Sequence, residues 1–314
     1  MNQEEVEKKC FLTINLRMAL SSYCYVKYLI LEVLMLENCK LSGFADEIHQ
    51  NIEVQINLLK RLGQNYIEFR SANGKGVADY TIEEALQLSR VLKEQGINVS
   101  AIGSPIGKIQ ITDDFNPHFE QFKHVVELSK ILETKYIRMF SFYIPPNENP
   151  ENYHEEVFAR MEQFVDYAKK QDVILLHENE KDIYGDNASR CLHLMERFYG
   201  DHFKCTFDFA NFVQCQQDTL EAYEMLKPYI EYIHVKDARM KDGEVVPPGL
   251  GDGHLNEIFQ ELHRAGFHGF LSLEPHLFNF EGLKNLEKNT SKRKMSNGEA
   301  AYHLAFDELK NILI

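Results

Sequence analysis

The sequence predicts an α/β protein that folds as a (β/α)8 barrel, the TIM barrel. Short apolar runs typical of buried strands alternate with segments of helical periodicity from residue 41 onward. Gly63, Gly96 and Gly266 each stand between a helical pattern and the next apolar run, where a residue in the left-handed conformation ends a helix at little cost. Eight strands can be counted, and such barrels commonly form one domain of ~250 residues.

The predicted strands and helices follow each other with little interruption. Strands are expected at residues 41–45, 65–70, 97–102, 135–140, 173–179, 205–208, 232–234 and 270–274. Helices are expected through Ile56 to Leu62 and at residues 82–95, 119–132, 153–170, 188–198, 219–226, 255–265 and 300–313. Residues 281–297 are rich in charge, which indicates a solvated segment. We therefore expect a single catalytic domain over residues 41–314.

Residues 1–40 are expected to form an N-terminal extension. Two interpretations stay open: an amphipathic helix with apolar residues from Val26 to Leu34, or a natural start at Met35 with non-native residues before it. Residues 18–36 are apolar, but Lys27 and Glu32 interrupt them, and a charge at a membrane midplane costs roughly 2.5 to 3.5 kcal/mol. We expect no membrane span, and no clear signal peptide is present.

Composition points to a small-molecule partner. The chain has 34 Lys and Arg against 48 Asp and Glu, a formal charge of −14, which disfavours nucleic acid and anionic membranes because both need clustered cations. The six cysteines show no CxxC spacing, so a disulfide framework is not indicated and a reducing cytoplasm is the expected location. Whether barrels pair into a homo-oligomer stays open.

Four of the predicted strands end in a side chain that can bind a metal. Glu178, Asp208, His234 and Glu274 are separated by 30, 26 and 40 residues, close to the length of one strand-helix unit. Because parallel barrel strands all end at one rim, these side chains should meet there. Three carboxylates and one imidazole favour Mn2+, Mg2+ or Co2+, with Zn2+ as a further option.

The strand ends and several short strings of the sequence resemble those of a known family. The four strand ends, together with the strings GFADEI, SPIGK, IRMFSFY, HEN, HVKD and LEPH, resemble the xylose isomerase-like TIM barrel superfamily, in particular its sugar phosphate isomerase/epimerase branch. The resemblance implies one divalent metal ion bound by Glu178, Asp208, His234 and Glu274. It also implies a sugar or sugar phosphate substrate, with Glu178 and Glu274 as the acid/base pair that moves a proton next to a carbonyl through an enediolate.

Three other functions stay open as alternatives. A metal-dependent dehydratase of a keto-polyol, similar to inosose dehydratase, begins with the same proton removal. An apurinic endonuclease resembles the chain at the same four ligands, but it requires more histidines, where this chain has Ile102-Gly103, Arg138-Met139 and Asn211. A barrel that binds a ligand without turnover would be expected to have a broken ligand set.

Further residues near the rim are candidates for substrate binding. These are Glu68, Arg138, Lys236 and His276. Structural alternatives stay open for each of them: an ion pair with Arg70 for Glu68, a buried ion pair for Arg138, a surface pair for Lys236 and packing for His276. Strand alternation predicts that His177 points away from Glu178. The loop at residues 249–253, with Asp252 and the adjoining His254, is either a phosphate-binding loop or a flexible turn.

Overall fold

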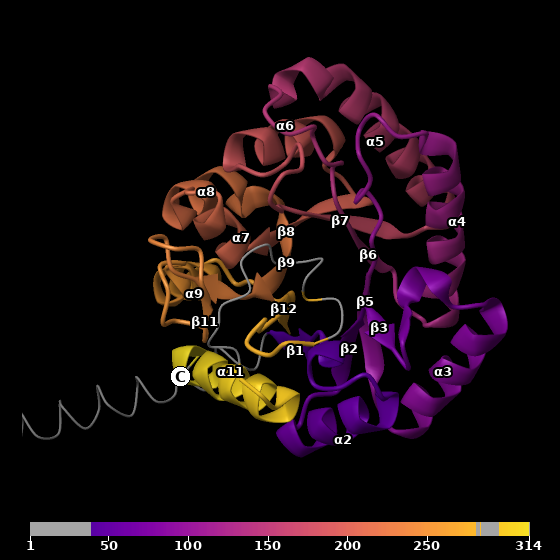
Figure 1. The fold of residues 1–314 in the computed structure, drawn as a ribbon, viewed down its shortest axis with the longest axis vertical. Coiled ribbons are helices and arrows are strands. Elements are labelled where there is room, and N and C mark those ends of the chain that lie inside the picture. The colour runs from indigo at the N-terminus through magenta and orange to yellow at the C-terminus, as the bar shows by residue number, and fades with distance from the viewer. Residues whose placement is uncertain (1–38, 281–282, 284–294, 314) are drawn as a thin grey trace, which may run out of the picture.

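A computed structural model describes residues 39–280, 283 and 295–313, and it confirms the predicted barrel (Figure 1). Eight parallel strands follow the hydrogen-bonded order β1-β12-β9-β8-β7-β6-β5-β2, and β1 and β2 lie side by side where this order ends. The strands are β1 (Lys40–Gly43), β2 (Tyr66–Phe69), β5 (Asn98–Gly103), β6 (Tyr136–Met139), β7 (Ile174–Glu178), β8 (Phe203–Asp208), β9 (Ile230–Val235) and β12 (Phe270–Leu273).

Helices form a ring around these strands, as Figure 1 shows in the view down the barrel. They are α2 (Ile52–Leu62), α3 (Ile82–Glu94), α4 (Phe115–Ile131), α5 (His154–Gln171), α6 (Ala188–Phe198), α7 (Phe209–Gln214), α8 (Thr219–Leu226), α9 (Leu255–Arg264) and α11 (Gly298–Leu313). Two hairpins, β3 (Ser71–Ala72) with β4 (Lys75–Gly76) and β10 (Asp237–Ala238) with β11 (Val245–Val246), extend from the strand ends. No helix of the described residues is long and apolar enough to cross a membrane.

Local sequence signals explain most helix boundaries. The side chain of Asn51 accepts hydrogen bonds from the first turn of α2, and Thr81 and Glu84 form a capping box at the start of α3. The three glycines predicted to end helices have φ values of 72°, 73° and 71°, which confirms their left-handed conformation. Both kinds of signal act within a few residues, so they could be predicted without knowledge of the fold.

Two helices differ from the prediction. Helix α4 begins at Phe115 rather than at residue 119, because Asp114 caps it and Pro117 lies in its first turn, where a missing N–H costs no hydrogen bond. Helix α7 was not predicted, because it begins directly at the end of β8 without an intervening loop. Residues 1–38, 281–282, 284–294 and 314 lie outside the described residues. The predicted N-terminal extension (residues 1–40), apart from its last two residues, and most of the predicted solvated segment (281–297) are among them.

The barrel interior changes from apolar to charged along its axis. Ala101, Leu176, Tyr232 and Phe270 form a buried cluster. Next to it, Ser100 Oγ contacts Ser42 Oγ at 2.6 Å and the hydroxyl of Tyr232 at 2.8 Å. This hydroxyl layer leads to the strand ends, where the buried charged residues lie.

The glycine-rich loop after β11 is built around one carboxylate. Asp237, which is buried, accepts backbone hydrogen bonds from Gly249 at 2.9 Å, Gly251 at 2.9 Å and Gly253 at 3.0 Å. A Cβ atom at Gly251 would lie 2.4 Å from Asp237 Oδ1, so the approach requires glycine there. These amides are occupied by Asp237, which disfavours their use as a phosphate-binding loop.

We expect Asp237→Ala to destabilise the fold by roughly 2 kcal/mol, because buried N–H groups left without an acceptor cost about 1–3 kcal/mol. Urea unfolding followed by circular dichroism measures this change. Asp166→Ala, which removes an exposed carboxylate from α5, is the matched control and should change stability by less than about 0.5 kcal/mol. Equal stability of the two variants would contradict the anchoring role of Asp237.

Candidate metal centre

Four metal-capable side chains meet at the carboxyl ends of neighbouring strands. Glu178 ends β7, Asp208 ends β8, His234 lies near the end of β9, and Glu274 follows β12. One ligand atom from each residue lies within 4.8 Å of the others, and all four side chains are buried. The structure therefore brings together the four residues that the sequence singled out as ligands.

His234 presents Nδ1 to this cluster. Its Nε2 lies 3.1 Å from Glu68 Oε2, which also accepts a hydrogen bond from Ser272 Oγ at 2.6 Å. Nδ1 lies 3.0 Å from Glu178 Oε1 and 3.8 Å from Glu274 Oε2. Burial alone would lower the pKa of His234, but Glu178 and Glu68 outweigh burial and raise that pKa well above its ordinary value. Glu68 thus orients the imidazole ring by contacting Nε2, the nitrogen that faces away from Glu178 and Glu274.

Asp208 uses its two carboxylate oxygens differently. Oδ1 accepts a hydrogen bond from the backbone N–H of Asn211 at 2.7 Å and so caps α7. Oδ2 faces the cluster and lies 3.0 Å from Lys236 Nζ. Burial raises the pKa of Asp208 to about 7, and Lys236 opposes this increase. The cap therefore fixes the carboxylate with one oxygen directed at the other ligands.

The donor set fits a divalent cation. Within the described part of the chain, the buried atoms His234 Nδ1 and Asp208 Oδ2 have ion-pair contacts at 3.0 Å but form no hydrogen bond of good geometry. Carboxylates this close repel each other unless positive charge lies among them. An ion bound by Glu178, Asp208, His234 and Glu274 would engage both atoms, and the oxygen-rich set suits Mg2+, Mn2+ or Co2+ while its imidazole also accommodates Zn2+.

Glu274 contacts three cationic groups in addition. Arg70 Nη1 donates to Oε1 at 2.8 Å, Lys236 Nζ donates to Oε2 at 3.0 Å, and His276 Nε2 lies 3.3 Å from Oε1. Burial alone would raise the pKa of Glu274, but Lys236 and His276 hold that pKa well below its ordinary value. Glu274 is therefore kept ionised, which is the form that binds a cation. The surface-pair alternative for Lys236 is wrong, because Lys236 is buried between two of the ligands.

Arg70 is a site residue that sequence reasoning missed. It contacts Asp46 at 2.8 Å and Glu47 at 3.3 Å, in the turn after β1, as well as Glu274. The alternative of a Glu68–Arg70 pair is wrong, because Glu68 is 1% exposed and binds His234. A signal was present in the sequence: Glu68 and Arg70 alternate with apolar residues, which places both on one face of the strand.

The remaining predicted site residues lie around this cluster. Arg138, on β6, places Nε 3.4 Å from Glu178 Oε2, and Asn211 Nδ2 donates to Glu178 Oε1 at 3.3 Å. Burial alone would raise the pKa of Glu178, but His234 and Arg138 lower it below its ordinary value. His276 connects Glu274 to Glu47. Its Nε2 lies 3.3 Å from Glu274 Oε1, and its backbone N–H donates to Glu47 Oε2 at 2.6 Å.

Three other polar residues lie away from the ligands. His177 contacts Ser141 Oγ at 3.0 Å, which fits the predicted direction away from Glu178. His254 contacts Thr219 Oγ1 at 3.0 Å, and Asp252 accepts a hydrogen bond from the backbone N–H of Met240 at 2.6 Å. None of them belongs to a group of described residues that could hold a metal ion.

A cavity of about 250 Å3 adjoins the cluster. Its walls include Arg70 and Arg138, which contact the ligands Glu274 and Glu178. A larger cavity of about 420 Å3 lies between the loops that follow β6 and β7. None of the four candidate ligands lines either cavity, but two wall residues of the smaller one, Arg70 and Arg138, form ion pairs with them. The smaller cavity is therefore the one from which a bound molecule would reach the ligands.

Residues 56–293 match the family model described as xylose isomerase-like TIM barrel, and the chain belongs to this family. A curated relative, 3-dehydroshikimate dehydratase of Bacillus anthracis, is 19% identical over 151 residues, which are 48% of this chain and 54% of the relative. The match thus spans about half the length of that relative.

Solved structures of several proteins, among them an epimerase and a probable dehydratase, share the fold. L-ribulose 3-epimerase aligns with a TM-score of 0.70 and 17% identity, over 88% of this chain and 94% of that chain. The probable 3-DHS dehydratase AsbF from Bacillus anthracis aligns with a TM-score of 0.64 and 18% identity, over 84% and 97%. The IOLI protein, which was solved with a zinc atom, aligns with a TM-score of 0.66 and 16% identity, over 87% and 98%. At these identities the likeness shows the fold alone.

We expect Mn2+ binding to weaken as the pH falls, first as His234 gains a proton and further below about 7 as Asp208 is protonated. The cation must displace the proton from Asp208, whose pKa lies at about 7 in the metal-free protein, and from His234, whose pKa is also raised. The affinity should fall about tenfold per pH unit for each proton displaced. Calorimetry in buffers of different ionisation enthalpy measures both the affinity and the proton release, and a pH-independent affinity without proton release would contradict the assignment.

Glu68→Gln should weaken Mn2+ binding by about tenfold or more, because partners that orient a ligand histidine typically contribute 10–100-fold to metal affinity. Glutamine keeps the size of the side chain but removes the charge that faces His234 Nε2. Glu53→Gln, an exposed change on α2, is the matched control. Unchanged affinity in Glu68→Gln would show that the contact does not support the metal centre.

Proposed function

We propose that this protein is a divalent-metal-dependent isomerase or epimerase of a sugar or sugar phosphate. The observation that carries the proposal is the placement of Glu178 and Glu274, two buried carboxylates that both approach His234 Nδ1 and whose arginine partners line the cavity. Membership in the xylose isomerase-like family and the fold shared with L-ribulose 3-epimerase support it.

The two glutamates are assigned the proton transfers. One carboxylate takes the proton from the carbon next to the substrate carbonyl, and the electron pair of the broken C–H bond moves to the carbonyl oxygen, which gives an enediolate. The other returns a proton to the opposite face and so inverts the carbon. A bound divalent ion would polarise the carbonyl and stabilise the negative charge. Asp208 and His234 would complete its ligands, and Lys236 would keep two of the carboxylates in place.

Dehydration of a keto-polyol is the second candidate. After the same proton removal, the C–O bond of a hydroxyl on the next carbon breaks, a C=C bond forms and water leaves, which requires a proton donor for that hydroxyl. The ammonium of Lys236, 3.0 Å from both Asp208 and Glu274, provides an N–H donor beside the ligands. The activity of the curated relative, a dehydratase, supports this candidate.

Glu178→Gln and Glu274→Gln should each lower kcat by at least about 100-fold, because a positioned acid or base typically contributes 10²–10⁴-fold. The assay uses a panel of ketoses, ketose phosphates and keto-polyols with Mn2+, Mg2+ or Co2+ in deuterated water. Ketose interconversion with deuterium incorporation supports the epimerase, and loss of water with a new ultraviolet-absorbing product supports the dehydratase.

Glu257→Gln, an exposed change on α9, is the control and should keep full activity. Circular dichroism establishes that the variants fold, and elemental analysis determines their metal content. Treatment with a chelator should abolish turnover, and added Mn2+ should restore it. Full activity in both glutamine variants, or in metal-free protein, would overturn the proposed function.

A further inference from the structure

Arg138 is a buried arginine whose Nε forms no hydrogen bond in the described part of the chain. The residue is 4% exposed, and its guanidinium carbon lies 5.5 Å from the ring centre of Phe44 and 4.4 Å from that of Phe140. No group in the described part of the chain accepts a hydrogen bond from its Nε, and the contact with Glu178 is an ion pair at 3.4 Å. Arginine carries several N–H donors, and buried donors are costly when they have no acceptor.

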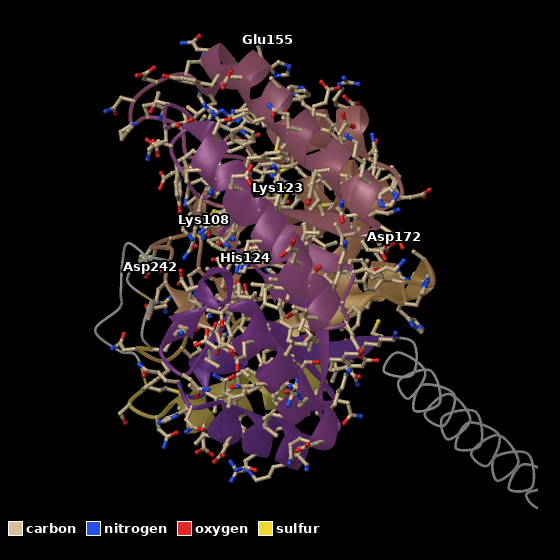
Figure 2. All side chains as sticks on the ribbon, turned by 90° about the vertical axis from the view of Figure 1, so that its right-hand side faces the viewer. Lys108, Lys123, His124, Glu155, Asp172 and Asp242 are labelled. Atoms are coloured by element: carbon tan, nitrogen blue, oxygen red, sulfur yellow. The ribbon has the colours of Figure 1, made fainter. Side chains whose placement is uncertain are left out.

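A second cation lines the same cavity. Lys108 Nζ lies 3.0 Å from Glu180 Oε2 and 4.2 Å from the ring centre of Phe140, the ring that also supports Arg138. Figure 2 shows Lys108 on the same side of the barrel as Asp242, in the turn after β10, and on the opposite side from Asp172, which precedes β7. Lys108 therefore belongs to the carboxyl-terminal rim, as the metal-capable residues do.

The cavity beside Arg138 requires glycine at position 103. Gly103, at the end of β5, also lines the cavity. A Cβ atom at this position would lie 2.6 Å from Phe44 and 3.4 Å from Arg138 Nη2. Glycine thus keeps the guanidinium accessible from the cavity, while the aromatic rings shield its faces from water.

We infer that this cavity binds an oxyanion of the substrate, with Arg138 and Lys108 as its two cationic contacts. The substrate is accordingly an anionic polyhydroxy ketone, a carboxylate or a phosphate ester, and not a neutral sugar. This inference rests on the proposed function, because it places the anion beside the glutamates that carry out the proton transfers.

Recognition by Arg138 would make the enzyme selective for charge. The guanidinium fork matches two oxygens of a carboxylate or phosphate, which gives strong and directional hydrogen bonds. A neutral sugar would leave the charge of Arg138 without an external anionic partner, and a site built for a polar partner rejects analogues that lack it. Arg70, the third cation of the cavity, is already held by Asp46 and Glu274, so it is the least suited of the three to take the anion.

Calorimetry on the full chain loaded with Mn2+ tests the inference. The probes are shikimate as a polyhydroxy carboxylate, inorganic phosphate as the phosphate group, and myo-inositol as a neutral polyol. At least one anion should bind more tightly than myo-inositol, and Arg138→Gln should weaken its binding at least about tenfold, the change expected for a lost charged hydrogen bond. Tighter binding of shikimate indicates a carboxylate, and tighter binding of phosphate indicates a phosphate ester.

Three variants serve as comparisons. Lys108→Met should also weaken anion binding, and Arg138→Lys, which keeps the charge without the fork, should restore part of it. Arg197→Gln removes an exposed charge of α6 and should change nothing. If Arg138→Gln does not fold, Lys108→Met and Arg138→Lys decide the outcome.

Anion binding that is unaffected by Arg138→Gln and Lys108→Met, or that Arg197→Gln weakens equally, would overturn the inference. Its failure can be distinguished from failure of the proposed function. Turnover of neutral sugars by the metal-loaded enzyme would retain the function and overturn the anionic substrate. Anion binding that depends on Arg138, in a protein without metal or turnover, would retain the oxyanion site and overturn the function.

Discussion

The structure depends on the burial of negative charge at one end of the barrel. Glu178, Asp208 and Glu274 meet within 4.8 Å, and removing such charges from water is costly unless opposite charges accompany them. Each carboxylate has a cationic neighbour: Arg138 for Glu178, and Lys236 for both Asp208 and Glu274. The cluster of carboxylates is therefore balanced by cations from the neighbouring strand ends, and removing Arg138 or Lys236 would leave a buried negative charge without its partner.

The strand register brings this arrangement about. Most of β8 and β9 pair residue by residue, but the register shifts by one between Cys205 and Thr206. With the shift, Asp208 lies opposite His234; an unbroken register would place Ile233 there. A single irregularity in the ladder thus sets two ligands side by side, which is a common use of such irregularities near functional sites. Capping of α7 by Asp208 then prevents the carboxylate from turning away.

The sequence predicted the cluster of metal-capable side chains because their signal is local. An apolar run that ends in a metal-capable side chain can be recognised within a few residues, and parallel topology brings such strand ends together. The partners of the ligands could not be predicted in this way. Glu68 meets His234 across 166 residues, and Glu47 meets the backbone of His276 across 229. The contacts of Glu68 with His234 and of Arg70 with Glu274 form only when the barrel closes and brings these distant segments together.

The same distinction explains why the substrate is harder to predict than the metal. Metal binding is decided by donor atoms, and these are visible as residue types. Substrate selection depends on which arginine and lysine side chains still have N–H donors available once their ion pairs with the buried carboxylates have formed. Glu178 belongs to the candidate metal centre and forms an ion pair with Arg138, so an ion that bound Glu178 would leave Arg138 with a greater need for an external acceptor. Metal and anion would then favour each other's binding, because linkage between two sites acts equally in both directions.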